Sequence, residues 1–137
     1  MKKMFVAALA LALMLTFTFG STAMAAEFDT GRELTQGQGW DASGKVKKQT
    51  GIGAAGKGNA DTVSNNSAIF QGTVRKPDGT NASNTARFTG RASFTMTSKK
   101  DGYGNALLRT GYEYRLRIAH RSNSPVNTAS CRGTWEP

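Results

Sequence analysis

Residues 50–61 read TGIGAAGKGNAD, and their glycines are spaced as in loops that hold phosphate groups. Gly51, Gly53 and Gly56 give the spacing G-x-G-x-x-G, and Gly51, Gly56 and Lys57 give G-x-x-x-x-G-K. Such loops work only between a buried strand and a helix whose first amides contact the phosphates. The residues before this segment are mostly polar, and Gly58 stands where the P-loop pattern needs Ser or Thr. We therefore predict an irregular, mobile loop over residues 51–66 and no phosphate site in it.

Arginines are the second group of residues that could bind a ligand. Six of them lie at odd-numbered positions in three segments whose alternating pattern predicts strands. Most apolar residues of these segments lie at the even-numbered positions. The guanidinium group suits two-pronged contact with sulfate, phosphate and carboxylate. If the strands are neighbours in one sheet, they form a polyanion-binding face composed of Arg75, Arg87, Arg91, Arg109, Arg115 and Arg117. The alternative is a solvated sheet face whose arginines cover apolar surface and keep the protein soluble.

Residues that typically perform catalysis are sparse. His120 is the only histidine, and its phase puts it on the apolar face at the end of a strand. Cys131 is the only cysteine, so an internal disulfide is excluded. A buried thiol is the favoured interpretation of Cys131, with an intermolecular bridge or a reactive group as alternatives. Without a triad, metal-ligand or cofactor motif, we predict a non-enzymatic protein with no catalytic residue, metal or cofactor.

The elements that position these residues alternate strictly between apolar and polar side chains. Residues 68–75, 86–97 and 107–120 each show a period of two, which indicates strands with one buried and one wet face. Turn signals follow at 76–79 and 99–102. We predict an all-β domain, a small antiparallel β-sandwich or barrel of about five to seven strands. The predicted core is Phe70, Val74, Phe88, Phe94, Met96, Leu108, Tyr112, Tyr114, Leu116, Ile118 and Trp135, with Trp40 as a further candidate.

The N-terminus predicts export. Lys2 and Lys3 precede a short apolar run, and Ala23-Met24-Ala25 has the small residues of a signal-peptidase site, in a bacterial style. The predicted organisation is a signal peptide over 1–25, a neutral Gly/Asn/Gln-rich segment over 26–67 and a basic antiparallel core over 68–137. Short strands are expected within 33–40 and 45–50, and a last strand within 126–135. The run is too short for a transmembrane helix, so we predict a soluble periplasmic or secreted protein.

The distribution of charged residues along the chain indicates the kind of partner to expect. Residues 26–67 carry five basic and five acidic side chains, so the excess positive charge of the chain, formally +9, lies outside them. The aromatic residues of the strands fall on the face opposite the arginines, which disfavours stacking on bases. The predicted partner is an anionic polymer: a polysaccharide, an envelope polymer or a nucleic-acid backbone. The main alternative is a structural or protein-partner-binding domain, and a secreted toxin or an unrecognised hydrolase is less favoured.

Overall fold

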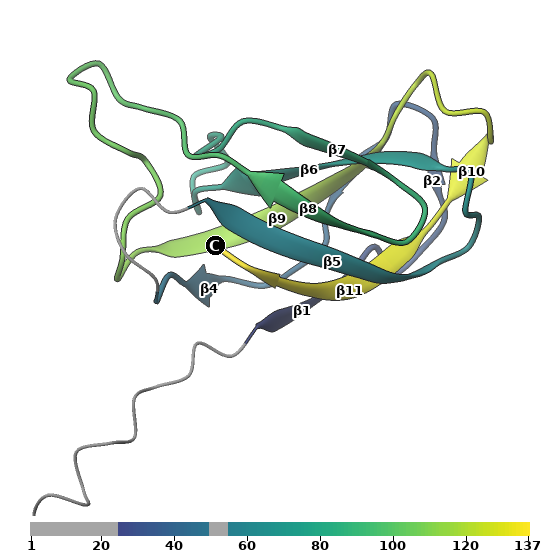
Figure 1. Cartoon of the computed structure of the whole chain (residues 1–137), viewed down its shortest axis with the longest axis horizontal. Coiled ribbons are helices and arrows are strands. Elements are labelled where there is room, and N and C mark those ends of the chain that lie inside the picture. The colour runs from purple at the N-terminus through teal and green to yellow at the C-terminus, as the bar shows by residue number, and fades with distance from the viewer. Residues whose placement is uncertain (1–24, 50–54) are drawn as a thin grey trace, which may run out of the picture.

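The computed structural model describes residues 25–49 and 55–137, and all regular structure in them is β (Figure 1). No helix occurs in these residues, so none could cross a membrane. The eleven strands exceed the predicted five to seven because several are only two or three residues long. They are β1 (Ala26–Asp29), β2 (Leu34–Thr35), β3 (Gly39–Asp41), β4 (Val46–Lys47), β5 (Gly56–Val63), β6 (Ile69–Arg75), β7 (Ala86–Thr89), β8 (Ala92–Met96), β9 (Glu113–His120), β10 (Thr128–Ala129) and β11 (Cys131–Glu136).

The strands form antiparallel sheets, which confirms the predicted all-β class. One sheet has the order β1-β11-β5-β8 and is called here the four-strand sheet. A second has the order β3-β9-β6-β7, with β4 also paired to β9, and is called the five-strand sheet. β10 and β2 form a small third sheet. Both larger sheets contain strands from 26–67 and from 68–137, so the two halves of the chain interleave.

The predicted alternation holds along the longest strands. In β9, Tyr114, Leu116, Ile118 and His120 are buried, while the residues between them are half-buried. Two predicted core residues are wrong. Tyr112 is 60% exposed because it precedes the first residue of β9, and Trp40 is 42% exposed because it lies on the edge strand β3. The Arg32 guanidinium covers the Trp40 ring, 4.1 Å from its centroid.

The predicted irregular loop over 51–66 is wrong for Gly56–Val63, which form β5 between β11 and β8. Residues 50–54 lie outside the described part of the chain. Along β5, Gly56, Gly58 and Ala60 are buried while the residues between them are exposed. This is the period-two alternation of a strand, built from very small side chains. The expected short strands before it correspond to β2, β3 and β4, and the expected last strand to β10 and β11.

The small residues of β5 make room for an aromatic cluster. Gly58 lies directly opposite Phe94 of β8, and a Cβ on Gly58 would collide with the Phe94 ring. A Cβ on Gly72 of β6, in the five-strand sheet, would lie 2.7 Å from Phe94 Cε2. The Phe94 ring also stacks on Phe88 at 4.3 Å between centroids and meets the edge of Phe28 at 6.2 Å. Phe94 therefore contacts strands of both larger sheets.

The first prediction compares neighbouring residues of β8. Phe94→Asp should unfold the protein, because it replaces a stacked ring by a buried carboxylate. Truncating a buried Phe alone removes about 3–5 kcal/mol, a large part of a typical total of about 5–15 kcal/mol. Thr95→Asp should leave a cooperative transition, because Thr95 is exposed. Urea unfolding followed by tryptophan fluorescence measures both, and equal losses of stability would contradict the strand register.

Candidate anion-binding face

Four of the six predicted arginines lie on one face of the five-strand sheet. Residues directly opposite each other on neighbouring strands share a face. Arg75 of β6 lies opposite Arg115 of β9, and Thr73 lies opposite Arg117. Arg87 of β7 lies opposite Gln71 of β6, two positions from Thr73 along that strand. The side chains on this outward face thus include Arg75, Arg87, Arg115 and Arg117, and we call it the arginine face.

The other two predicted arginines lie elsewhere. Arg91 is exposed in the turn between β7 and β8, strands that belong to different sheets. Arg109 lies in the segment between β8 and β9, where its Nη2 is 3.1 Å from the Asp101 carboxylate and its Nε donates to the carbonyl of Ala106. The predicted strand over residues 107–120 is therefore wrong for residues 107–112, which include Arg109. The structure ends β8 at Met96 and begins β9 at Glu113.

The segment between β8 and β9 projects from the body of the molecule, at the upper left of Figure 1. Asp101 organises it by accepting hydrogen bonds from the backbone N–H groups of Tyr103 and Asn105. The bond from Asn105 is the main reason that the pKa of the Asp101 carboxyl lies below its ordinary value. Tyr103 is 94% exposed on this projection, next to the exposed Lys99 and Lys100.

The arginines of the face differ in their partners. Arg75 Nε donates to the Gly79 carbonyl at 2.7 Å, and Arg75 Nη1 lies 3.5 Å from Asp41 Oδ1. Arg75 therefore stabilises the turn after β6. In the described chain, no carboxylate lies within salt-bridge distance of Arg87, Arg115 or Arg117.

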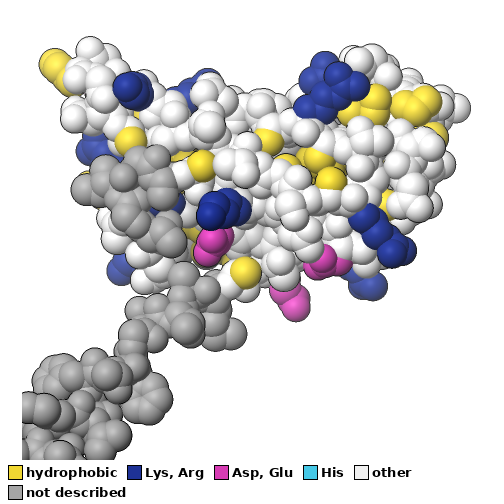
Figure 2. Space-filling model, viewed as in Figure 1, with side chains coloured by type: hydrophobic (Ala, Val, Ile, Leu, Met, Phe, Trp, Pro, Cys, Tyr) yellow, Lys and Arg dark blue, Asp and Glu magenta, His cyan; other side chains and the backbone are white. Residues whose placement is uncertain are grey.

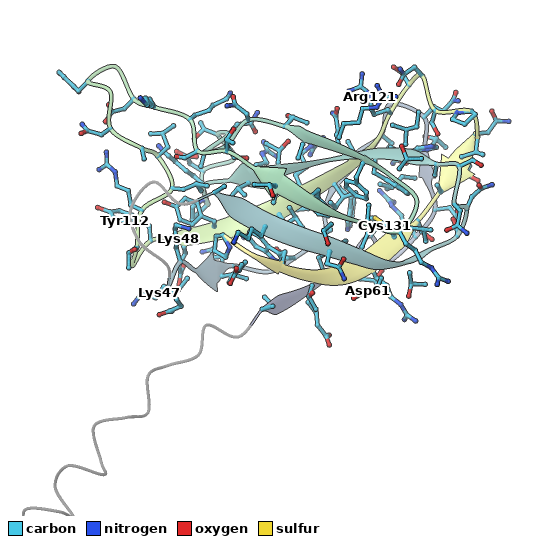
Figure 3. The ribbon with its side chains drawn as sticks, viewed as in Figure 1. Lys47, Lys48, Asp61, Tyr112, Arg121 and Cys131 are labelled. Carbon is cyan, nitrogen blue, oxygen red and sulfur yellow. The ribbon has the colours of Figure 1, made fainter. Side chains whose placement is uncertain are left out.

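Arg121 joins the face although sequence analysis missed it. Its Nη1 donates to Gln71 Oε1 at 3.1 Å, and its Nε donates to Asn123 Oδ1 at 3.0 Å. Figure 3 shows Arg121 at the top of the view, away from Lys48 and Cys131. The alternating pattern ends at His120, so Arg121 reads as the start of a loop. The available signal was its odd position, in phase with Arg115 and Arg117.

Carboxylates lie on both outer faces, and several lie opposite a basic side chain of the neighbouring strand. The arginine face has Asp41 opposite Arg117 and Glu113 opposite Lys47. On the outer side of the four-strand sheet, Asp29 lies opposite Arg132 and Glu136 opposite Lys57. Figure 2, viewed from the side of β5 and β11, shows dark blue and magenta side chains scattered among uncharged ones. The arginine face differs in also having Arg75 opposite Arg115.

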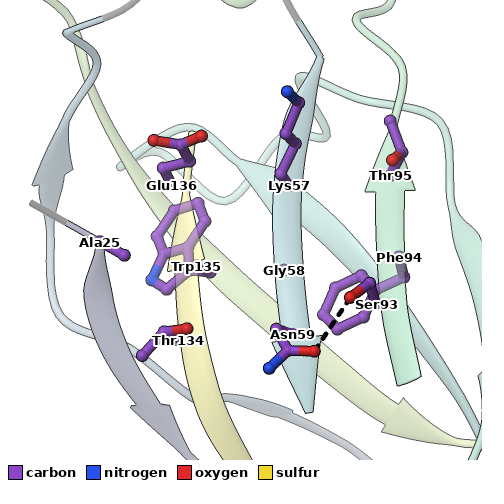
Figure 4. A pocket seen from close by; sticks show the side chains of 10 residues that line it. All are labelled: Ala25, Lys57, Gly58, Asn59, Ser93, Phe94, Thr95, Thr134, Trp135 and Glu136. Atoms are coloured by element: carbon purple, nitrogen blue, oxygen red, sulfur yellow. Dashed lines mark hydrogen bonds between the residues drawn. The ribbon is translucent and has the colours of Figure 1, made fainter. Parts of the chain in front are cut away.

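A shallow hollow of about 320 Å³ lies on the four-strand sheet (Figure 4). Ser93 Oγ donates to Asn59 Oδ1 there at 2.9 Å, and Thr95 and Thr134 add hydroxyl groups. Its charged residues, Lys57 and Glu136, face each other across β5 and β11. Because these charges oppose each other, the hollow lacks the excess positive charge that an anion site needs.

The remaining reactive side chains are packed into the core. His120 is fully buried at the end of β9, as predicted, and its Nδ1–H donates to the Leu34 carbonyl at 2.9 Å. Its ring lies 5.6 Å from that of Phe70. Among residues 25–49 and 55–137, no three His, Cys, Asp or Glu side chains gather as metal ligands would.

Cys131 and Lys48 are both buried, in separate parts of the molecule (Figure 3). Burial, together with the negative charge of Asp29, raises the pKa of the Cys131 thiol to about 12. The predicted buried thiol is thus confirmed. Burial lowers the pKa of Lys48, and the Glu136 carboxylate partly offsets this effect. Lys48 Nζ donates to the Pro137 carbonyl oxygen at 2.5 Å, which links the segment after β4 to the residue after β11.

Comparison with protein-family models, with curated proteins and with solved structures finds no match to this chain.

The second prediction concerns Cys131. At pH 8 the native thiol should react with a disulfide reagent at least about a hundredfold more slowly than in urea, because only the thiolate attacks and burial suppresses it. Colorimetric thiol titration with and without urea measures the two rates. As pH rises from about 9 towards 12, the native state should also lose stability relative to Cys131→Ala, because the unfolded thiol ionises first. Rapid modification of the native protein at pH 8 would contradict this burial.

Proposed function

We propose that this chain is an exported, non-catalytic binding protein whose arginine face contacts an anionic polymer. We further propose that its two larger sheets pack against each other as a β-sandwich. The contacts of Phe94 with Gly58 in one sheet and with Gly72 and Phe88 in the other support this packing. A sandwich leaves one side of each sheet outward, and the arginine face is the outward side of the five-strand sheet.

The observation that carries the binding proposal is the pair Arg75 and Arg115. They lie directly opposite each other in the centre of the five-strand sheet. Like charges in such a pair destabilise a sheet, and Asp41 lies near only one of them. Arg117 and Arg87 add further positive charge to the same face. A bound polyanion would neutralise this repulsion and release its counterions.

The chemistry of the face favours a charged backbone over bases. The aromatic residues of the same strands, Phe70, Phe88 and Tyr114, are buried on the inner side. Base recognition in single strands needs exposed rings for stacking. The proposed partner is therefore a polysaccharide, an envelope polymer or the backbone of a nucleic acid.

Export is supported by the position of β1. This strand begins at Ala26, the residue that cleavage after Ala25 would leave at the N-terminus. Cleavage there would keep the whole of β1 and its register, in which Ala26 lies opposite Trp135. The proposed location is the periplasm or the extracellular medium.

A second candidate function is recognition of a protein partner. The observation that favours it is the projecting segment between β8 and β9, which presents the exposed Tyr103. Exposed tyrosine is enriched at protein interfaces. Binding through this segment would depend less on salt than binding of a polymer to the arginine face.

The third prediction tests the arginine face. The protein with residues 26–137 should be retained on heparin or on oligothymidylate resin at low salt and elute as salt rises. The variant Arg115→Gln/Arg117→Gln should elute at lower salt, and its slope of log affinity against log salt should fall by about one to two.

The matched control is Lys57→Gln/Arg132→Gln, which removes the same charge from the outer side of the four-strand sheet. It should elute close to the parent protein. If the two variants elute together, overall charge and not the arginine face governs retention. If the parent is not retained at low salt, the polymer hypothesis is wrong.

The fourth prediction concerns processing. Expressed with its full N-terminus in a bacterium, the protein should be recovered outside the cytoplasm and begin at Ala26, because Ala23 and Ala25 fit the signal-peptidase site. Intact mass and N-terminal sequencing check this result. Recovery of a chain that still begins at Met1 would contradict it.

A further inference from the structure

We propose that the arginine face contains a defined groove for one tetrahedral oxyanion, a sulfate or phosphate group, with Ala119 at its floor and Arg117 and Arg121 on its two sides. This inference rests on the proposed function and specifies where the anionic group of the polymer binds. We call it the Ala119 groove.

The floor of the groove is a row of small side chains. Gly39 of β3 lies opposite Ala119 of β9, and Ala119 lies opposite Gln71 of β6. A hollow of about 280 Å³ covers Ala119 and Gln71 of this row, and its other lining residues are Gly37, His120, Arg121 and Ser122. Along the outward side of β9, Arg115 and Arg117 are followed by Ala119. The short side chain of Ala119 rises less far above the sheet than the arginines do.

Arg117 does not line this hollow but lies next to it, over Gly39 of β3, which pairs with Ala119. A Cβ on Gly39 would lie 2.7 Å from the Arg117 Cζ, so the guanidinium lies directly above Gly39. Glycine at this position is what allows Arg117 to lean towards the Ala119 row. The Arg117 side chain is only half-buried, which leaves part of it open to a ligand.

Arg121 borders the opposite side and is held in place by neutral groups. Its two hydrogen-bond acceptors are the amide oxygens of Gln71 and Asn123. Arg75, by contrast, has the carboxylate of Asp41 within 3.5 Å. Gln71 and Asn123 thus orient the Arg121 guanidinium without cancelling its charge, which is the arrangement that anion binding requires.

The directions of the donors favour a tetrahedral anion. Arg117 and Arg121 reach the row from opposite sides, and Arg87 lies at its far end, opposite Gln71. A carboxylate has two oxygens in one plane and pairs with two parallel N–H groups of a single guanidinium. A sulfate or phosphate group has oxygens pointing in several directions and can accept from more than one guanidinium at once.

The test uses ¹⁵N-labelled protein and simple anions. Sodium sulfate and sodium phosphate, added at constant ionic strength, should shift the amide resonances of Gln71, Ala119 and Ser122 along a saturable curve. Sodium acetate should leave them nearly unchanged. Arg117→Gln and Arg121→Gln should each weaken sulfate binding about tenfold, which corresponds to about 1.4 kcal/mol, since each removes a charge-assisted hydrogen-bond donor.

Two controls have the same loss of charge. Arg91→Gln lies in the exposed turn between β7 and β8, away from the arginine face, and Arg132→Gln lies on the other sheet; both should bind sulfate within about twofold of the parent. Ala119→Glu is a second way to block the groove, because it places a carboxylate on the floor without removing an arginine. It should abolish the shifts while circular dichroism stays unchanged.

The outcomes separate this inference from the proposed function. If Arg121→Gln and Arg91→Gln weaken sulfate binding equally, or acetate binds as well as sulfate, the groove is wrong. Retention on heparin would still support the arginine face in that case. If neither heparin nor oligothymidylate retains the parent, both proposals fail. A competition experiment identifies which polymer supplies the sulfate or phosphate group. Sulfated oligosaccharide and oligothymidylate are each added to the sulfate-bound protein, with the parent compared with Arg121→Gln.

Discussion

The structure depends on one contact, the Phe94 ring seated against two glycines that belong to different sheets. Gly58 lies beneath the ring in the four-strand sheet, and Gly72 approaches it from the five-strand sheet. Any larger side chain at either position would have to displace the ring. Because interiors are packed as densely as organic crystals, that displacement would spread to Phe88 and Met96. Gly56, which belongs to the phosphate-loop spacing, is likewise buried in β5, where a Cβ would lie 2.8 Å from Val74 Cγ2, so it serves packing of the core.

This contact also determines which side chains face outward. Side chains alternate along a strand, so burying Phe70, Phe88 and Tyr114 directs Arg87, Arg75 and Arg115 to the other side. A slip of one residue in register would reverse every position and bury the arginines. The core and the arginine face are thus two consequences of the same register. Mutations in the aromatic cluster would be expected to affect ligand contacts through the alignment of β6, β7 and β9.

Sequence patterns were most informative where alternation was strong, as in β6, β8 and β9. They failed for β5, because its glycines have low strand propensity and its burial depends on partners in β8 and β11 that are distant in the chain. Tyr112 and Trp40 were assigned to the core because the alternation of apolar and polar residues does not show where a strand begins or which strand lies at the edge of a sheet. Arg121 was missed because its position is set by Gln71, fifty residues away in the chain.

The contrast between the two outer faces is the strongest argument against arginines that only maintain solubility. On the four-strand sheet, opposite charges are placed across from each other on neighbouring strands, with Asp29 opposite Arg132 and Glu136 opposite Lys57. The edge strands of the five-strand sheet show the same placement, with Asp41 opposite Arg117 and Glu113 opposite Lys47, although these side chains do not come within salt-bridge distance. At its centre, β6 and β9 instead place Arg75 opposite Arg115. The arginine face thus differs from the other outer face in placing two arginines directly opposite each other, with the Asp41 carboxylate near Arg75 alone, which is the arrangement expected of a surface that is completed by an external anion.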